Sequence, residues 1–172
     1  SFSKLKKVDT VLGPEMKSTG EIIGKDVNLP KALYKGFIAS GVHVPDYGTA
    51  LMTVSDKDKE EIIPLAKRLI SLGYHIVATT GTGKALEAEG IKVDVIEKIN
   101  ENSNDILDAI RDGRINLVVN TMTEGKTSET DGFLIRREAV ENNIPCLTSL
   151  DTAEALLQAM ETIHFQLEDM SK

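Results

Sequence analysis

The amino-acid sequence predicts an α/β domain with a doubly wound, mainly parallel five-stranded sheet that carries helices on both faces. Three observations support this fold class. Short apolar segments typical of strands alternate five times with longer segments of helical period. Most connections between these segments are short. The strand segments are also largely apolar on both faces, as expected for parallel strands covered by helices on each side.

The predicted strands are runs of four or five aliphatic and β-branched residues, and polar or glycine-containing segments follow them. They span residues 50–54, 74–78, 93–96, 115–119 and 144–147. The first four predicted helices alternate with these strands and span residues 56–72, 81–89, 104–111 and 132–141. Gly73, Gly90 and Gly113 follow three of them and are the expected helix stops, because glycine readily takes the left-handed conformation found there. A last helix is predicted to begin at Asp151, with Glu154 completing a variant of the capping box.

Residues 1–46 lack this regular pattern and predict a short N-terminal appendage before a second unit at residues 47–172. A turn-like segment surrounds Pro14, and residues 29–40 have the character of a short helix that ends at Gly41. The segment around Pro45 is typical of a linker. The chain opens at Ser1 in polar sequence without a methionine, which suggests a fragment of a longer protein.

Composition narrows the functional classes. The formal net charge of -7 argues against a general nucleic-acid or acidic-membrane binder. No apolar run approaches the roughly 20 residues that span a bilayer, and no secretory signal is visible. Cys146 is the single cysteine, so no disulfide framework is expected and a reducing, cytoplasmic setting fits. His43, His75 and His164 lack metal-ligand spacing, and we expect no metal site.

The residues that follow the predicted strands form the candidate site, because ligands of open parallel sheets bind outside the carboxyl ends of the strands. Hydroxyls, amides and lysines dominate this set, and it contains no histidine or cysteine. Such a set suits the binding of a hydroxyl-rich anion better than catalysis. The set comprises Ser55, Asp56, Lys59, Thr79, Thr80, Gly81, Thr82, Glu97, Lys98, Asn120, Thr121, Thr123, Thr148 and Ser149.

The segment Ala78–Lys84 (ATTGTGK) is the most specific part of this set. It follows a predicted strand and opens a helix, where outward backbone N–H groups and the helix dipole favour an anion. Gly81 and Gly83 allow close approach of the backbone. The segment is neither a Walker loop nor G-x-G-x-x-G, because Ala78 and Leu86 replace the required glycines. The alternative is a glycine-rich turn whose threonines only cap the helix.

Lys59 lies in the first turn of its predicted helix, where a cation opposes the helix dipole, and this unfavourable position points to an anionic partner. A solvated surface lysine is the alternative. Lys98 directly follows a strand and is also compatible with an ordinary edge residue. Asn120 and Thr121 could bind a ligand or form an Asx turn.

Several of these residues carry a resemblance to a known family. The string Val11–Glu21 (VLGPEMKSTGE) strongly resembles the segment that closes the second ATP-grasp unit of the carbamoyl-phosphate synthetase large subunit. The rest of the chain resembles the terminal, methylglyoxal-synthase-like domain of that subunit. The matching pieces are Thr53–Val54, Asp58–Lys59, Ala78–Thr82, Lys98, Val119–Thr121 and Ile135–Arg137.

The resemblance implies a regulatory domain that binds a nucleotide effector such as UMP or IMP; some family members respond to other effectors. It implies phosphate binding by Lys59, Thr79, Thr80, Gly81, Thr82 and Lys98, and sugar or base contacts from Asn120, Thr121 and Thr123. Thr148 matches the family position nearest an ornithine-responsive interface, and Thr53 is a second candidate there. The segment Asn120–Gly125 is one residue longer than the family pattern, which leaves the assignment of Thr123 open.

The resemblance also implies a larger assembly. The whole synthetase makes carbamoyl phosphate from bicarbonate, glutamine-derived ammonia and ATP, for pyrimidine and arginine biosynthesis. Its partners would be the rest of the large subunit and the glutaminase small subunit, and its cofactors ATP with Mg or Mn. This chain lacks the ATP-grasp body, so we expect no cofactor and no catalysis here, while self-association stays open.

Two other readings compete with this one. A stand-alone triose-phosphate lyase of the methylglyoxal synthase type would need a general-base aspartate before the third helix. The resemblance places Ser103 at that position, and Asp105 is predicted to lie within the helix. A docking module with an empty sheet edge is the second alternative.

Overall fold

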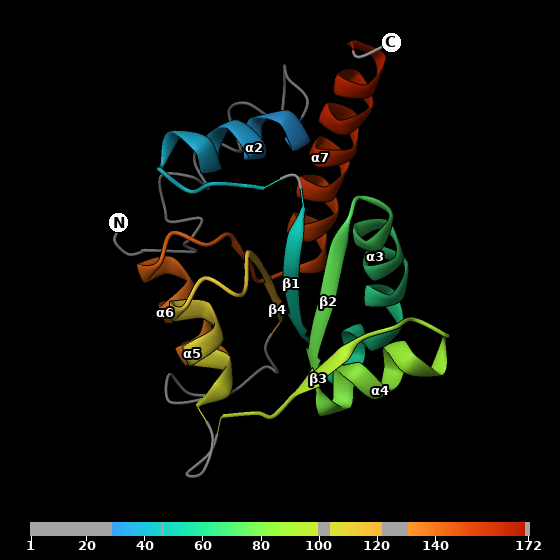
Figure 1. Ribbon diagram of the computed structural model, residues 1–172, viewed down its shortest axis with the longest axis vertical. Coiled ribbons are helices and arrows are strands. Elements are labelled where there is room, and N and C mark those ends of the chain that lie inside the picture. The colour runs from blue at the N-terminus through green and yellow to red at the C-terminus, as the bar shows by residue number, and fades with distance from the viewer. Residues whose placement is uncertain (1–28, 46, 100–103, 122–130, 171–172) are drawn as a thin grey trace.

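The computed structural model describes residues 29–45, 47–99, 104–121 and 131–170. Among these residues, five strands form one sheet in the order β3-β2-β1-β4-β5, and every neighbouring pair is parallel. The predicted fold class is therefore confirmed (Figure 1). The strands are β1 (Gly48–Thr53), β2 (Tyr74–Thr79), β3 (Asp94–Ile96), β4 (Leu117–Asn120) and β5 (Cys146–Leu147).

Helices cover both faces of the sheet. Figure 1 shows α3 and α4 on one side of the strands and α5 and α6 on the other, with α7 rising beside α2. No helix in the described part of the chain combines the length and the apolar character needed to span a membrane. The helices are α2 (Leu29–Ala39), η1 (Asp56–Asp58, a 3-10 turn), α3 (Lys59–Ser71), α4 (Thr80–Ala88), α5 (Asp105–Arg111), α6 (Asp131–Glu141) and α7 (Leu150–Met170).

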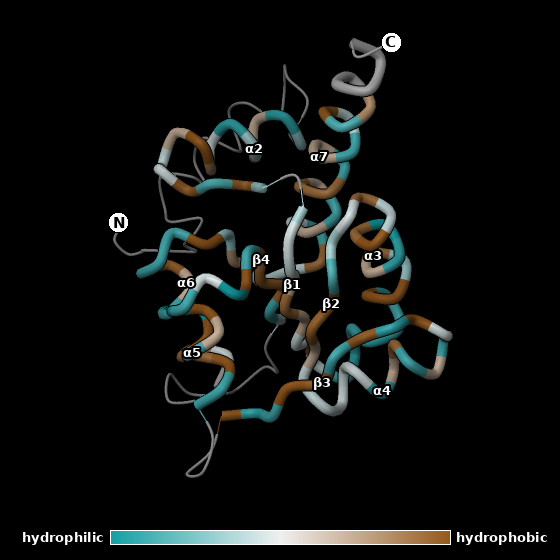
Figure 2. The backbone as a smooth tube through the Cα atoms, in the orientation of Figure 1, coloured by the Kyte–Doolittle hydropathy of each residue, from teal (hydrophilic) through white to brown (hydrophobic). Residues whose placement is uncertain are grey.

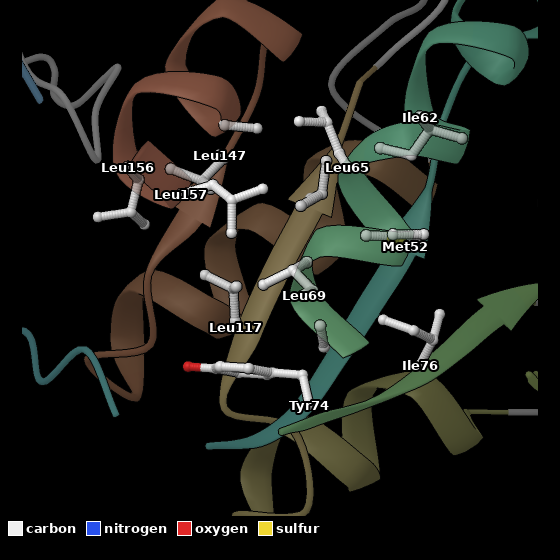
Figure 3. Close-up of a cluster of buried hydrophobic side chains, with 14 of the residues drawn as sticks. Met52, Ile62, Leu65, Leu69, Tyr74, Ile76, Leu117, Leu147, Leu156 and Leu157 are labelled. Carbon is white, nitrogen blue, oxygen red and sulfur yellow. The ribbon is translucent and has the colours of Figure 1, made fainter. Parts of the chain in front are cut away.

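Side-chain alternation along the strands divides the core into two layers. In β1, Ala50 and Met52 enter the cluster under α3 and α7, whereas Leu51 enters the cluster under α5 and α6. In Figure 3, leucines from α3 and α7 gather with Met52 and Leu117 in the first cluster. Figure 2 shows apolar and polar residues alternating along α3 and α7, as expected for helices with one buried face. Burial on both faces fixes the register of the strands. The register in turn determines which residues lie at the ends of the strands.

The helix ends confirm most of the sequence pattern and correct one prediction. Gly73, Gly90 and Gly113 have φ values of +106°, +78° and +80°, so they stop their helices as predicted. The last helix begins at Leu150, one residue before the predicted start, and the capping box at Asp151 was wrong. The hydroxyl of Ser149 instead accepts a hydrogen bond from the Thr152 N–H at 3.2 Å, which makes Ser149 the cap.

The described part of the N-terminal segment packs against the domain. Leu33 and Phe37 of α2 and Val44 after it belong to the same buried cluster as the sheet residues under α7. The Tyr74 hydroxyl also donates a hydrogen bond to the Pro45 carbonyl at 2.5 Å. The domain boundary at residue 46 stays a prediction, but these side chains stabilise the same core as the sheet.

One ion-pair cluster joins α3 to α7. The guanidinium of Arg68 contacts Glu161 through Nη2 at 2.6 Å and Nε at 3.0 Å, and Glu154 through Nη1 at 2.5 Å. These hydrogen bonds, chiefly the one to Glu161, raise the pKa of Arg68 above its usual value. The paired, bidentate geometry is the kind that adds stability even near the surface.

Replacing Arg68 with Met should destabilise the fold by about 1 kcal/mol, since the pair is only partly buried. That loss corresponds to a fall in melting temperature of about 2–4 °C. Lys67→Met is the matched control, because Lys67 is an exposed cation one residue away. Equal melting temperatures for the two variants would contradict a stabilising role for the cluster.

Candidate functional site

The strand order places the switch point of the doubly wound sheet between β1 and β4. The chain leaves β1 toward α3 on one face of the sheet, and α6, which follows β4, lies on the other. Connections that diverge from neighbouring strands open a gap at the carboxyl edge, where ligands of this architecture bind. The described residues among those predicted to follow β1, β2, β3 and β4 lie along this edge.

Buried hydrogen bonds join the ends of β1 and β4. The Ser55 N–H donates to Thr121 Oγ1 at 3.0 Å, and the Thr121 N–H donates to the Thr53 carbonyl at 3.2 Å. Asn120 is almost fully buried, and its Nδ2 donates to the Gly132 carbonyl at the start of α6, at 2.7 Å. Asn120 and Thr121 therefore stabilise the backbone conformation at this edge of the sheet.

Two of the three predicted phosphate-binding threonines are buried. The Thr79 hydroxyl donates to Thr53 Oγ1 at 3.0 Å, and Thr82 Oγ1 accepts from the Val54 N–H at 3.1 Å. Each is 2% exposed, whereas Thr80 is exposed. Thr79 occupies the N-cap position of α4, yet its hydroxyl bonds to β1 instead of the first helical turn. These two threonines thus join the start of α4 to β1. The alternative prediction, in which the threonines only cap the helix, does not explain the hydrogen bond of Thr79.

Lys59 reaches the start of α4. A Cβ atom built on Gly81 would lie 2.9 Å from Lys59 Nζ, so the ammonium group sits directly over this glycine. Lys59 is the first residue of α3, and β1 and β2 are neighbours in the sheet. That adjacency brings the lysine and the glycine-rich segment together, as the sequence predicted. A cation and the positive end of a helix therefore lie side by side, an arrangement that favours a bound anion.

A carboxylate balances part of this positive charge. Asp56 Oδ1 lies 2.5 Å from Lys59 Nζ. The hydrogen bond from Lys59 and its charge hold the pKa of the Asp56 carboxyl below its usual value, and the charge of Lys98 adds to the effect. We call Lys59, Asp56 and Gly81 at the start of α4 the Lys59 cluster. The charge of Lys98 acts on this cluster, although Lys98 follows β3 at the edge of the sheet.

The remaining predicted residues lie apart or outside the described residues. Thr148 follows β5, which is three strands away from β2, so it does not join the Lys59 cluster. Thr123 and Ser103 fall outside the described residues, while Asp105 is the exposed first residue of α5. No group of three or more His, Cys, Asp or Glu residues in the described ranges is placed to hold a metal ion.

In the sequence, Asp56 has no predicted role beyond following a strand. The structure places its carboxylate against Lys59. The signal was present, because Asp56 and Lys59 are three residues apart and such pairs meet on a helical turn.

The architecture and the position of the cluster define an α/β domain whose candidate ligand site lies at the carboxyl edge of a parallel sheet. A family model for the MGS-like domain matches residues 61–148. The chain therefore belongs to the MGS-like domain family. β1 and Lys59 lie just before the matched range.

Solved structures share the fold. The methylglyoxal synthase from Elizabethkingia anophelis NUHP1 matches with a TM-score of 0.56 and 19% identity, over 66% of this chain and 79% of the synthase. ForH matches with a TM-score of 0.50 and 24% identity, over 67% of this chain and 80% of its own. At these identities the likeness establishes the fold alone.

Replacing Gly81 with Ala should weaken anion binding with little change in stability. The new methyl group would meet Lys59 Nζ at 2.9 Å, and the flexible end of that side chain would move away. We expect a several-fold loss in affinity for a phosphate ligand, measured by calorimetric titration, and a melting temperature within about 2 °C of the parent. A large fall in the melting temperature would instead indicate a structural role for Gly81.

Proposed function

We propose that this chain is the effector-binding allosteric domain of a carbamoyl-phosphate synthetase large subunit. The effector would be a phosphate-bearing nucleotide such as UMP or IMP, bound at the carboxyl edge of the sheet. Its binding would regulate the synthesis of carbamoyl phosphate elsewhere in the subunit. The chain itself would bind without catalysing a reaction.

The position of Lys59 over Gly81 is the observation that carries the proposed ligand class. The ammonium group, the start of α4 and the exposed Thr80 offer a phosphate its preferred contacts, a cation with backbone and hydroxyl donors. Lys98 adds positive charge near the same point. Asn120 and Thr121 lie across β1 from this cluster, where the sugar or base of a nucleotide would extend.

The synthetase context rests on sequence. The string Val11–Glu21 resembles the end of an ATP-grasp unit, and family membership is compatible with a regulatory domain joined to such a unit. The proposed partners are accordingly the rest of the large subunit and the glutaminase small subunit. A cytoplasmic location follows from the same proposal.

Thermal unfolding with a panel of ligands tests the proposal. UMP, IMP, phosphoribosyl pyrophosphate, ornithine and dihydroxyacetone phosphate would each be added at high concentration. A ligand at about 100 times its dissociation constant adds roughly 2.7 kcal/mol, which corresponds to a rise in melting temperature of about 5–10 °C. A rise with one nucleotide supports the proposal and identifies the effector. No rise with any phosphate compound contradicts it, and methylglyoxal formation from dihydroxyacetone phosphate would identify a lyase instead.

A further inference from the structure

An acidic side chain lies inside the positively charged cluster. Asp56 pairs with Lys59 at 2.5 Å, and Lys59 in turn lies over Gly81 at the start of α4. The proposed phosphate would need this same ammonium group. Two negatively charged groups, one from the chain and one from the ligand, would therefore compete for Lys59.

Hydrogen bonds hold Ser55 and Asp58 on either side of Asp56, whose own side chain is exposed. The Ser55 N–H is fixed to Thr121, and the Ser55 hydroxyl donates to Asp58 Oδ2 at 2.9 Å. Asp58 is thus turned back toward Ser55. The Asp56 side chain is 95% exposed, against 27% for Lys59. Water can solvate the Asp56 carboxylate once it has separated from Lys59, so breaking this ion pair costs little free energy.

We propose that Asp56 is an internal counter-ion that occupies Lys59 in the empty site and must yield to the phosphate of the effector. The inference rests on the proposed function and names a residue that lowers the phosphate affinity of that site. A phosphate monoester carries a charge of about -1.5 to -2 at pH 7 and has three acceptor oxygens. It therefore competes well with a carboxylate of charge -1 for the ammonium group of Lys59. Breaking the Asp56–Lys59 pair costs free energy, so Asp56 lowers the affinity of the site.

The opposite role for Asp56 makes a distinct prediction. If its carboxylate accepted hydrogen bonds from ligand hydroxyls, such as those of a ribose, then removing its charge would weaken nucleotide binding. The sign of the change in affinity separates the two roles.

Calorimetric titrations with UMP and IMP, and with the singly charged methyl esters of both nucleotides, provide the test. Asp56→Asn removes the competing charge and keeps the size of the side chain. Glu60→Gln is the matched control, because Glu60 is an exposed acid beside Lys59 in the first turn of α3. Both variants change the net charge equally. A third comparison places Asp56→Asn in a Lys59→Met background.

We expect Asp56→Asn to bind nucleotide about two- to fivefold more tightly, which is the range that one exposed ion pair supplies. The gain should be at least as large for the monoester as for the methyl ester, because a nearby carboxylate repels the more highly charged phosphate more strongly. Glu60→Gln should have a smaller effect on both. The gain should vanish in the Lys59→Met background, because the competition acts through Lys59.

The outcomes separate this inference from the proposed function. Binding by the parent chain with no gain in Asp56→Asn, or an equal gain in Glu60→Gln, overturns the counter-ion role and leaves the nucleotide site intact. Weaker binding by Asp56→Asn also overturns it. If neither the parent nor Asp56→Asn binds any of the four probes, the proposed function fails, and the inference that rests on it fails too.

Discussion

Replacing Lys59 with Met is expected to weaken nucleotide binding by roughly 10- to 150-fold, or about 1.5–3 kcal/mol, the range for a hydrogen bond to a charged group. The ammonium group over Gly81 is the cation placed closest to the start of α4 among the contacts described above. Without it, the phosphate would keep only backbone, hydroxyl and more distant Lys98 contacts. Calorimetric titration of the effector identified by thermal unfolding measures the loss.

Lys92→Met is the control for this substitution. Lys92 is exposed and precedes β3, so it lies near the opposite edge of the sheet from the candidate site. It should leave the affinity nearly unchanged, and Lys98→Ala should fall between the two. The fold itself should tolerate Lys59→Met, because a cation at a helix start is unfavourable and its ion pair is exposed. Equal affinities for the Lys59 and Lys92 variants would remove Lys59 from the site.

Replacing Phe37 with Ala is expected to lower the free energy of unfolding by about 3–4 kcal/mol, with a fall in melting temperature of roughly 10 °C. Phe37 is 1% exposed and belongs to the cluster that also contains Met52 and Leu156. Its removal would leave a cavity between α2 and the body of the domain. Urea unfolding monitored by circular dichroism measures the change.

Ile38→Ala provides the matched comparison, since Ile38 is the next residue on the same helix and is 49% exposed. Its cost should stay below about 1 kcal/mol. The pair also tests the predicted boundary at residue 46. If Phe37→Ala were as mild as Ile38→Ala, α2 would be a dispensable appendage, and the unit at residues 47–172 would be stable without it.

The order of helices and strands could be predicted because its signals are local. The short apolar run Leu117–Val119 lies between polar residues, which favours a buried strand, and Gly90 or Gly113 marks the end of a helix by its own backbone preference. The start of α7 was misplaced because Ser149 and Asp151 both suit a helix cap. The hydrogen bond that decides between them depends on the path of the chain after β5.

The site could be predicted as a location but not as a set of bonds. The rule about strand ends places Lys59 and Gly81 on one edge from the sequence alone. The bonds of Thr79 to Thr53 and of Thr82 to Val54 depend on which strands are neighbours and in what register. The spacing of Asp56 and Lys59 allows their pairing, and the 3-10 turn that precedes α3 sets its geometry. The two threonine bonds join residues far apart in the chain, so they are not visible in the local pattern of residues.

The packing of α2 on α7 has a mechanical consequence. Leu33 and Phe37 anchor α2 in the core, so α2 moves with the body of the domain. A rotation of α2 would displace α7, because the two helices pack together. Arg68 of α3 forms ion pairs with α7, so α3 is linked to the same contacts. Since Lys59 is the first residue of α3, direct contacts run from α2 through α7 and α3 to the candidate ligand site.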